Sequence, residues 1–86
     1  MDDIKQLRTQ IDSLDEKLLE VLAERFSVVE SIKESKIAHG IQTEDLDREQ
    51  EVITERKRIA RELGLREELV EALFEVIIKY SKKAQQ

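Results

Sequence analysis

The chain has 86 residues, of which 40% are hydrophobic, and its 15 Lys and Arg against 20 Asp and Glu give a net charge of −5. This length allows one small domain, residues 1–86, and excludes a two-domain enzyme. With no Cys and one His, disulfides and cysteine-rich zinc sites are impossible, and the acidic balance argues against nucleic acid or an anionic membrane as a partner.

Two glycines, Gly40 and Gly64, divide a proline-free chain into three stretches, and glycine is favoured just after helix ends. We therefore predict an all-α fold of three helices. The first, over residues 3–37, begins with acidic residues and contains no long apolar run, which predicts a cytoplasmic protein without signal peptide or membrane span. Nine of its positions follow an alternating three-four spacing, and eight of them are apolar: Ile4, Leu7, Ile11, Leu14, Leu18, Val21, Arg25, Val28 and Ile32.

The second and third helices are shorter. The second is predicted over residues 45–63, with Asp45 or Thr43 as its N-cap, and the third over residues 66–84. The apolar face of the second comprises Leu46, Val52, Ile53, Ile59, Ala60 and Leu63. The apolar face of the third comprises Leu69, Val70, Leu73, Phe74, Ile77 and Ile78.

The helix lengths predict a homodimer. About 35 residues span about 50 Å, whereas the two shorter helices reach only about 30 Å and leave part of the first helix uncovered. Near its middle the first helix also widens its apolar surface with further residues, namely Leu19, Leu22, Phe26 and Val29. An intertwined homodimer that shares one core is the simplest cover, and a monomeric three-helix bundle with a protruding helix is the alternative.

Cationic residues interrupt or follow the apolar seam of the first helix. Arg25 occupies a seam position, where a guanidinium needs an anion or access to water. Lys36 follows eleven residues later, about 20° around the helix, so both side chains are able to reach one ligand. Arg8 lies about 25 Å before Arg25 along the axis, too far to share that ligand within one chain. In an antiparallel dimer it would reach the partner's site.

Polar residues also occupy inward positions of the other helices. Glu49 has the spacing of the apolar face of the second helix, and the stripe through Ile77 continues onto Ser81 and Gln85. Each has a plain structural alternative: a snorkelling Arg25, a solvated Lys36, a frayed helix end, or surface pairing of Glu49 with Arg48 or Arg56. Together they predict a pocket for a small polyanion that bears a hydroxyl group.

These residues resemble the all-helical chorismate mutases of the AroQ class over nearly the whole chain. The matching pattern comprises Leu7-Arg8, the run from Ile11 to Leu19, Leu22-Ala23-Glu24-Arg25, Lys36, Asp45, Arg48-Glu49, Leu73-Phe74, Ile77-Ile78, Ser81 and Gln85. The resemblance implies an intertwined homodimer that converts chorismate to prephenate in aromatic amino-acid biosynthesis. It implies no metal or cofactor, and this length leaves no room for a fused dehydratase, dehydrogenase or synthase domain.

The resemblance also implies roles for single residues. Arg25 and the partner's Arg8 would bind the substrate carboxylates, and Glu49 would accept a hydrogen bond from the ring hydroxyl. Lys36 would contact a carboxylate and the ether oxygen, to which Gln85 would also donate. The remaining wall would be formed by Asp45, Arg48 and Ser81.

Two alternative functions remain open. An isochorismate–pyruvate lyase has a similar fold and cationic pocket, but lyase relatives tend to be apolar at the position of Glu49, which favours the mutase. A non-catalytic dimeric helical module is the other alternative, and it leaves the inward polar residues unexplained. An assay with chorismate and isochorismate separates the three.

Overall fold

The computed structural model describes residues 2–41 and 45–85, which form α1 (Asp2–His39), α2 (Leu46–Leu63) and α3 (Glu67–Ala84). The predicted all-α class is confirmed, since no strand occurs within these two ranges. The predicted helix limits differ from the observed ones by two residues or fewer. No helix in the described ranges combines the length and the apolar character needed to cross a bilayer.

The helix ends follow local sequence signals. Asp45 is the N-cap of α2, and its Oδ1 accepts a hydrogen bond from the Arg48 backbone N–H at 3.0 Å. The alternative cap, Thr43, lies outside the described residues. Gly40 and Gly64 follow α1 and α2 with φ of 68° and 74°, the left-handed conformation that glycine adopts without a steric penalty. The sequence therefore predicts where α1 and α2 stop.

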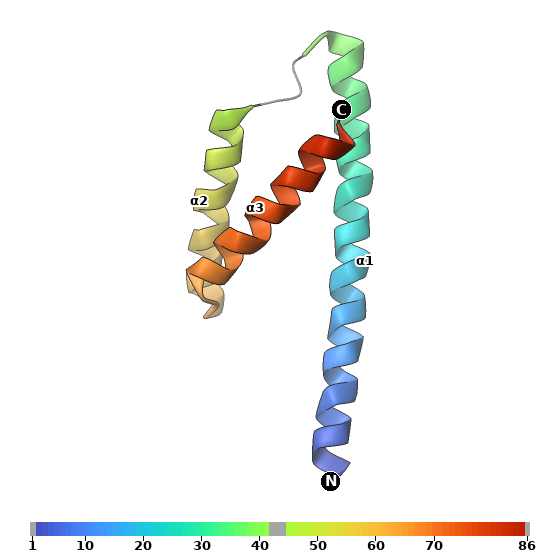
Figure 1. The fold of residues 1–86 in the computed structure, drawn as a ribbon, viewed down its shortest axis with the longest axis vertical. Helices are drawn as coiled ribbons and strands as arrows, with labels where there is room; N and C mark the ends of the chain where they lie inside the picture. The colour runs from blue at the N-terminus through green and yellow to red at the C-terminus, as the bar shows by residue number, and fades with distance from the viewer. Residues whose placement is uncertain (1, 42–44, 86) are drawn as a thin grey trace.

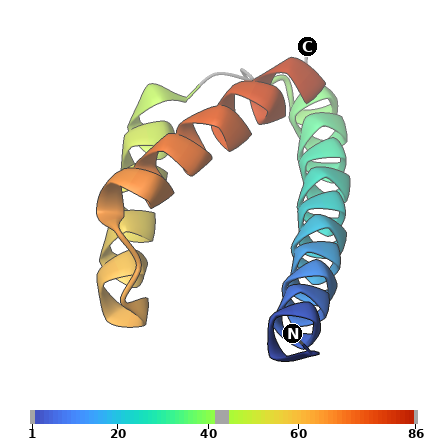
Figure 2. The same cartoon turned by 60° about the horizontal axis from the view of Figure 1, so that its bottom comes forward.

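The three helices form an open arch in which α3 is the bridge (Figures 1 and 2). α3 packs against α2 along much of its length and crosses the C-terminal half of α1. In the described residues no Cα atom of α1 lies within 8 Å of one of α2. The two outer helices are thus held in place through α3.

The core of the single chain is small and lies around α3. The buried apolar side chains come from all three helices: Val29, Val52, Ala60, Val70 and Ile77. Ser81 is 7% exposed and continues this core into a polar end. The other predicted apolar positions are half-buried or exposed, and the exposed ones include Leu46, Leu63 and Leu69. A single chain therefore buries only part of its apolar pattern.

The first half of α1 stands clear of the rest of the chain (Figure 1). The radius of gyration is 16.4 Å, against about 12 Å for a compact domain of this length. The longest dimension, 58 Å, is close to the length of α1, about 57 Å for 38 residues at 1.5 Å per residue. The exposed apolar residues in the first half of α1 are Ile4, Leu7, Ile11, Leu14, Leu18 and Val21. The predicted failure of α2 and α3 to cover α1 is confirmed.

Candidate active site

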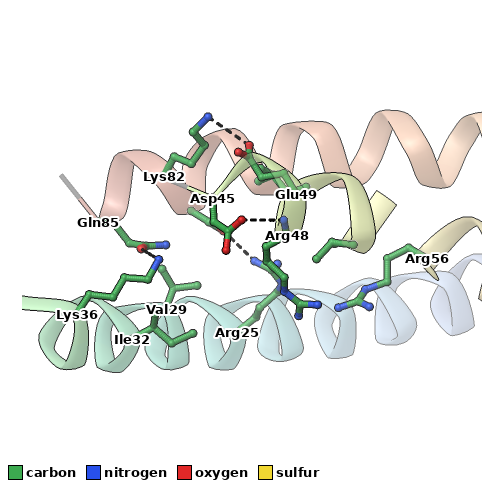
Figure 3. Close-up of a pocket in the computed structure, with 13 residues that line it drawn as sticks. Arg25, Val29, Ile32, Lys36, Asp45, Arg48, Glu49, Arg56, Lys82 and Gln85 are labelled. Atoms are coloured by element: carbon green, nitrogen blue, oxygen red, sulfur yellow. Dashed lines mark hydrogen bonds and ion pairs between the residues drawn. The ribbon is translucent and has the colours of Figure 1, made fainter. Parts of the chain in front are cut away.

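A pocket of about 320 Å³ lies between the C-terminal half of α1, the start of α2 and the end of α3 (Figure 3). This volume falls in the range of sites for small organic molecules. Its lining residues are Arg25, Val29, Ile32, Lys36, Asp45, Arg48, Glu49, Val52, Arg56, Ile78, Ser81, Lys82 and Gln85. The structure thus brings together seven of the eight predicted site residues, all except Arg8.

Arg25 is held in the pocket by α3. Its Nη1 donates to Ser81 Oγ at 2.8 Å, and Ser81 Oγ donates to the Ile77 backbone carbonyl at 2.8 Å. Ser81 is buried, so its hydroxyl has a fixed position between the guanidinium and the helix backbone. The predicted inward orientation of both residues is confirmed.

The surroundings of Arg25 are rich in positive charge. Burial lowers the pKa of Arg25 below its ordinary value, and the nearby guanidinium groups of Arg56 and Arg48 lower it further. Among the described residues, no carboxylate forms an ion pair with Arg25. A half-buried guanidinium beside two others suits the binding of an anion.

Lys36 and Gln85 meet where α1 and α3 end. Lys36 Nζ donates to Gln85 Oε1 at 3.2 Å, and Figure 3 shows the two side chains meeting at one end of the pocket. Both positions are fixed by helix ends, because the Lys36 carbonyl accepts from the Ile41 N–H and the Gln85 N–H donates to the Lys82 carbonyl. The two side chains place a cation and an amide donor at one end of the pocket.

Glu49 is the carboxylate that faces this group of cations. Its Oε1 lies 3.2 Å from Lys82 Nζ, and its Oε2 is buried without a hydrogen-bond partner in the described part of the chain. The local alternative, pairing of Glu49 with Arg48 or Arg56, is wrong: the partner comes from α3, and Arg48 pairs with Glu51 instead. A buried acceptor without a donor suits a ligand hydroxyl.

Asp45 and Arg48 form the wall at the start of α2. The Asp45 carboxylate caps the helix through the Arg48 N–H, so its position follows from the backbone. The Arg48 guanidinium is exposed and donates to Glu51 at 2.7 Å. Both residues line the pocket as predicted, with Arg48 at its open side.

Arg8 is the predicted site residue that does not line the pocket. It lies near the start of α1, seventeen residues before Arg25, which is about 25 Å of helical rise. This agrees with the prediction that Arg8 does not reach the site of its own chain.

Sequence reasoning missed two cations of the pocket, Arg56 and Lys82. Arg56 lies over the Phe74 ring, 5.7 Å from its centroid, and follows Glu49 by seven residues on the same face of α2. Lys82 follows Ile78 by four residues and therefore continues the inward stripe of α3. Both spacings were visible in the sequence, and Arg56 interrupts the apolar stripe between Ile53 and Ala60 as Glu49 does between Leu46 and Ile53. Both residues were left out because charged side chains are usually solvated.

The pocket offers charges and hydrogen bonds rather than a nucleophile. It contains neither Cys nor His, and its buried hydroxyl, Ser81 Oγ, donates to a backbone carbonyl. His39 lies elsewhere, at the exposed end of α1, where its Nδ1 contacts the Ser35 carbonyl at 2.8 Å. The arrangement suits binding and orientation of a small anionic molecule that carries a hydroxyl group.

Comparisons with known proteins agree with this geometry. The family model for chorismate mutase type II matches residues 7–86. The chorismate mutase of Methanocaldococcus jannaschii is 28% identical over 82 residues, which cover 95% of this chain and 83% of that protein. The T-protein of Enterobacter agglomerans is 32% identical over 79 residues, 92% of this chain and 21% of that protein. A bifunctional chorismate mutase/prephenate dehydratase of Buchnera aphidicola is 31% identical over 78 residues, 91% of this chain and 20% of that protein.

Proposed function

We propose, because this chain belongs to the chorismate mutase type II family, that it catalyses the rearrangement of chorismate to prephenate in aromatic amino-acid biosynthesis. The chain spans about a fifth of the T-protein and of the bifunctional relative. The proposal therefore concerns the mutase reaction alone and takes no further activity from those longer proteins.

The observation that carries the proposal is the charge arrangement of the pocket. Arg25 has no carboxylate partner in the described residues, whereas Glu49 Oε2 is a buried acceptor without a donor. A molecule with carboxylates and a hydroxyl group supplies both missing partners. Chorismate has two carboxylates, a ring hydroxyl and an ether oxygen, so its groups match the pocket in number and kind.

The reaction breaks one C–O bond and forms one C–C bond within a single molecule, without proton transfer or a covalent intermediate. Arg25 would hold a carboxylate and fix the folded conformer, and Glu49 would accept from the ring hydroxyl. Lys36 and the Gln85 amide would donate to the ether oxygen as it gains negative charge in the transition state. Arg48, Asp45 and Ser81 would complete the walls and orient these groups.

An assay with two substrates tests the proposal. Chorismate consumption with formation of prephenate supports a mutase, and release of pyruvate from isochorismate supports a lyase. The buried Glu49 Oε2 favours the mutase, because it needs a hydroxyl donor within the pocket. Turnover of neither substrate by folded protein would leave a non-catalytic helical module and overturn the proposal.

We further propose that the active unit is an intertwined homodimer in which Arg8 completes the partner's site. The exposed apolar residues of the first half of α1 support an interface there, since a chain in water gains free energy by covering such a stripe. Arg8 lies on this half of α1, about 25 Å from the pocket of its own chain. An antiparallel second copy would bring it to the second pocket as an additional carboxylate ligand.

Mixing two inactive variants tests the shared site. Arg8→Ala and Lys36→Ala chains each lack one component, but a heterodimer of the two contains one intact site. We expect activity to return on mixing or co-expression, measured as prephenate formation against each variant alone. Heterodimers that form, as shown by differently tagged chains, but stay inactive would contradict the shared site.

A further inference from the structure

The two oxygens of the Glu49 carboxylate have different surroundings. Oε1 lies 3.2 Å from Lys82 Nζ, whereas Oε2 is buried and lacks a hydrogen-bond partner in the described residues. Figure 3 shows Lys82 approaching Glu49 from α3, across the boundary between the two helices. One oxygen is thus tied to the protein and the other is left for a donor from outside it.

The ion pair also separates two hollows. Glu49, Ile78 and Lys82 line both the pocket and a neighbouring hollow of about 350 Å³. The outer hollow is also lined by Glu75, Lys79 and Lys83, so two further lysines lie on the far side of the pair. Without Lys82, the Glu49 side chain would have cations of both hollows near it and no ion-pair partner between them to fix its direction.

The ion pair between Lys82 and Glu49 orients the Glu49 carboxylate more than it stabilises the fold. The side chains of Glu49 and Lys82 are 25% and 35% exposed, and partly exposed ion pairs add little to folding. The terminal torsion of a glutamate side chain has broad energy wells, however, so a carboxylate turns easily unless one of its oxygens is held. Fixing Oε1 therefore fixes the direction of Oε2 at little cost to the fold.

We propose that Lys82 is a positioning residue that sets the specificity of the site for a substrate hydroxyl. By holding Glu49 Oε1, Lys82 fixes the carboxylate at the pocket wall, so that Oε2 accepts a hydrogen bond from the ring hydroxyl of chorismate when the substrate is bound. Lys82 acts through Glu49 and does not touch the reacting atoms. This inference rests on the proposed mutase function.

Three variants separate orientation from charge. Lys82→Met removes the cation while keeping most of the side-chain volume, and Lys82→Arg keeps a donor for Oε1. Lys79→Met is the matched control, because it removes one positive charge from the outer hollow without contacting Glu49. We expect Lys82→Met to lower kcat/KM for chorismate about tenfold, Lys82→Arg to restore most of this loss and Lys79→Met to change it less than twofold.

The substrate hydroxyl provides the decisive readout. On an analogue in which hydrogen replaces the ring hydroxyl, Lys82→Met should match the wild type within about twofold, because Oε2 then has nothing to hold. An equal loss on both substrates would overturn the inference and leave Lys82 as a general source of positive charge. If the wild type itself does not convert chorismate, the proposed function fails instead.

A double-mutant cycle with Glu49→Gln gives a second test. If Lys82 acts through Glu49, then Lys82→Met should cause no further loss of kcat/KM in the Glu49→Gln background. Independent losses that multiply would overturn the proposal even if the single variant is impaired. Circular dichroism and thermal unfolding check that each variant is folded, and Lys82→Gln replaces Lys82→Met if that protein does not fold.

Discussion

The two halves of α1 carry the same three-four spacing of apolar residues, yet their surroundings differ. In the first half Leu14 and Leu18 are 61% and 60% exposed. In the second half Val28 and Ile32 on the same spacing are still 58% and 42% exposed, but Val29, one position off it, is buried. The second half also carries Arg25 and Lys36, which face the pocket. One continuous helix thus combines an uncovered apolar stripe with one wall of a binding site. The comparison teaches that the same apolar spacing occurs on a helix half that its own chain partly covers and on a half that its own chain leaves exposed.

Charging the uncovered half should have the largest effect. In Leu14→Asp/Leu18→Asp we expect the proposed homodimer to dissociate about 10³ times more readily, because each leucine buried in such an interface would contribute about 2 kcal/mol. Activity should fall with it, since the sites would be shared. Sedimentation velocity and kcat/KM measured at the same protein concentrations test this. Lys17→Asp is the control, because it changes a charge in the same stretch at a position off the apolar spacing, and it should leave dissociation and kcat/KM unchanged. A wild-type protein that is monomeric would contradict the proposed homodimer.

Removing Arg25 from the second half of α1 should abolish activity without dissociating the proposed homodimer. Arg25→Ala removes a positioned charge donor, which is typically worth about 10²- to 10³-fold in rate. The fold should persist or gain stability, because burial and two neighbouring guanidinium groups already disfavour the charge of Arg25. Kinetics and thermal unfolding decide between the roles, with Arg58→Ala on the exposed face of α2 as the control. Full turnover together with a large loss of stability would make Arg25 structural.

Gln85→Glu, a change next to Lys36 in the pocket, should make the activity sensitive to pH. The introduced carboxyl donates to the ether oxygen only while protonated, and once ionised it would pair with Lys36, whose Nζ lies 3.2 Å from Gln85 Oε1. We therefore expect activity in acid and a progressive loss as pH rises through the pKa of that carboxyl. The wild type should keep a flatter profile. Measuring kcat/KM from about pH 4.5 to 8.5 tests this, given a reference Glu pKa of about 4.3. Parallel profiles would remove Gln85 from the proposed site.

Ser81→Ala should have the smallest effect of the four. Arg25 loses the oxygen that accepts from its Nη1 at 2.8 Å but keeps its place on α1. A single hydrogen bond of this kind corresponds to about a 3- to 10-fold change in kcat/KM. Ser31→Ala is a matched control, because that hydroxyl also donates to the carbonyl four residues earlier but on an exposed face. Equal losses in both variants would show that helix packing, rather than the orientation of Arg25, is responsible.

Much of the fold was predictable because its signals are local. Asp45 begins α2 through its own side chain, and the glycines after α1 and α2 adopt the conformation that ends a helix. The crossing of α3 over α1 was not predictable, since it depends on contacts between residues far apart in the sequence. Neither was the partial burial of Phe26, because apolar spacing does not reveal how far a neighbouring helix extends.

The candidate site was predictable where a polar residue interrupts an apolar stripe. Arg25, Glu49 and Ser81 stand at such positions, and all three line the pocket. Lys82 was missed although it continues the stripe after Ile78, because its contact with Glu49 depends on a distance between α2 and α3 that the sequence does not contain. The homodimer stays a prediction, since it concerns contacts between chains.

Because α3 contacts both α1 and α2, it determines how far apart the two helices that carry the pocket walls lie. Arg25 lies on α1 and Glu49 on α2. In the described residues of one chain the backbones of these two helices both pack against α3 and not against each other. Ala60, which is 1% exposed against α3, lies about 16 Å along α2 from Glu49. A larger side chain there would tilt α2 and move Glu49 relative to Arg25 without touching the pocket. We therefore expect the size of residue 60 to influence the distance between Arg25 and Glu49, although it lies outside the pocket. A displacement of about 1 Å at a site can cost about 100-fold in rate.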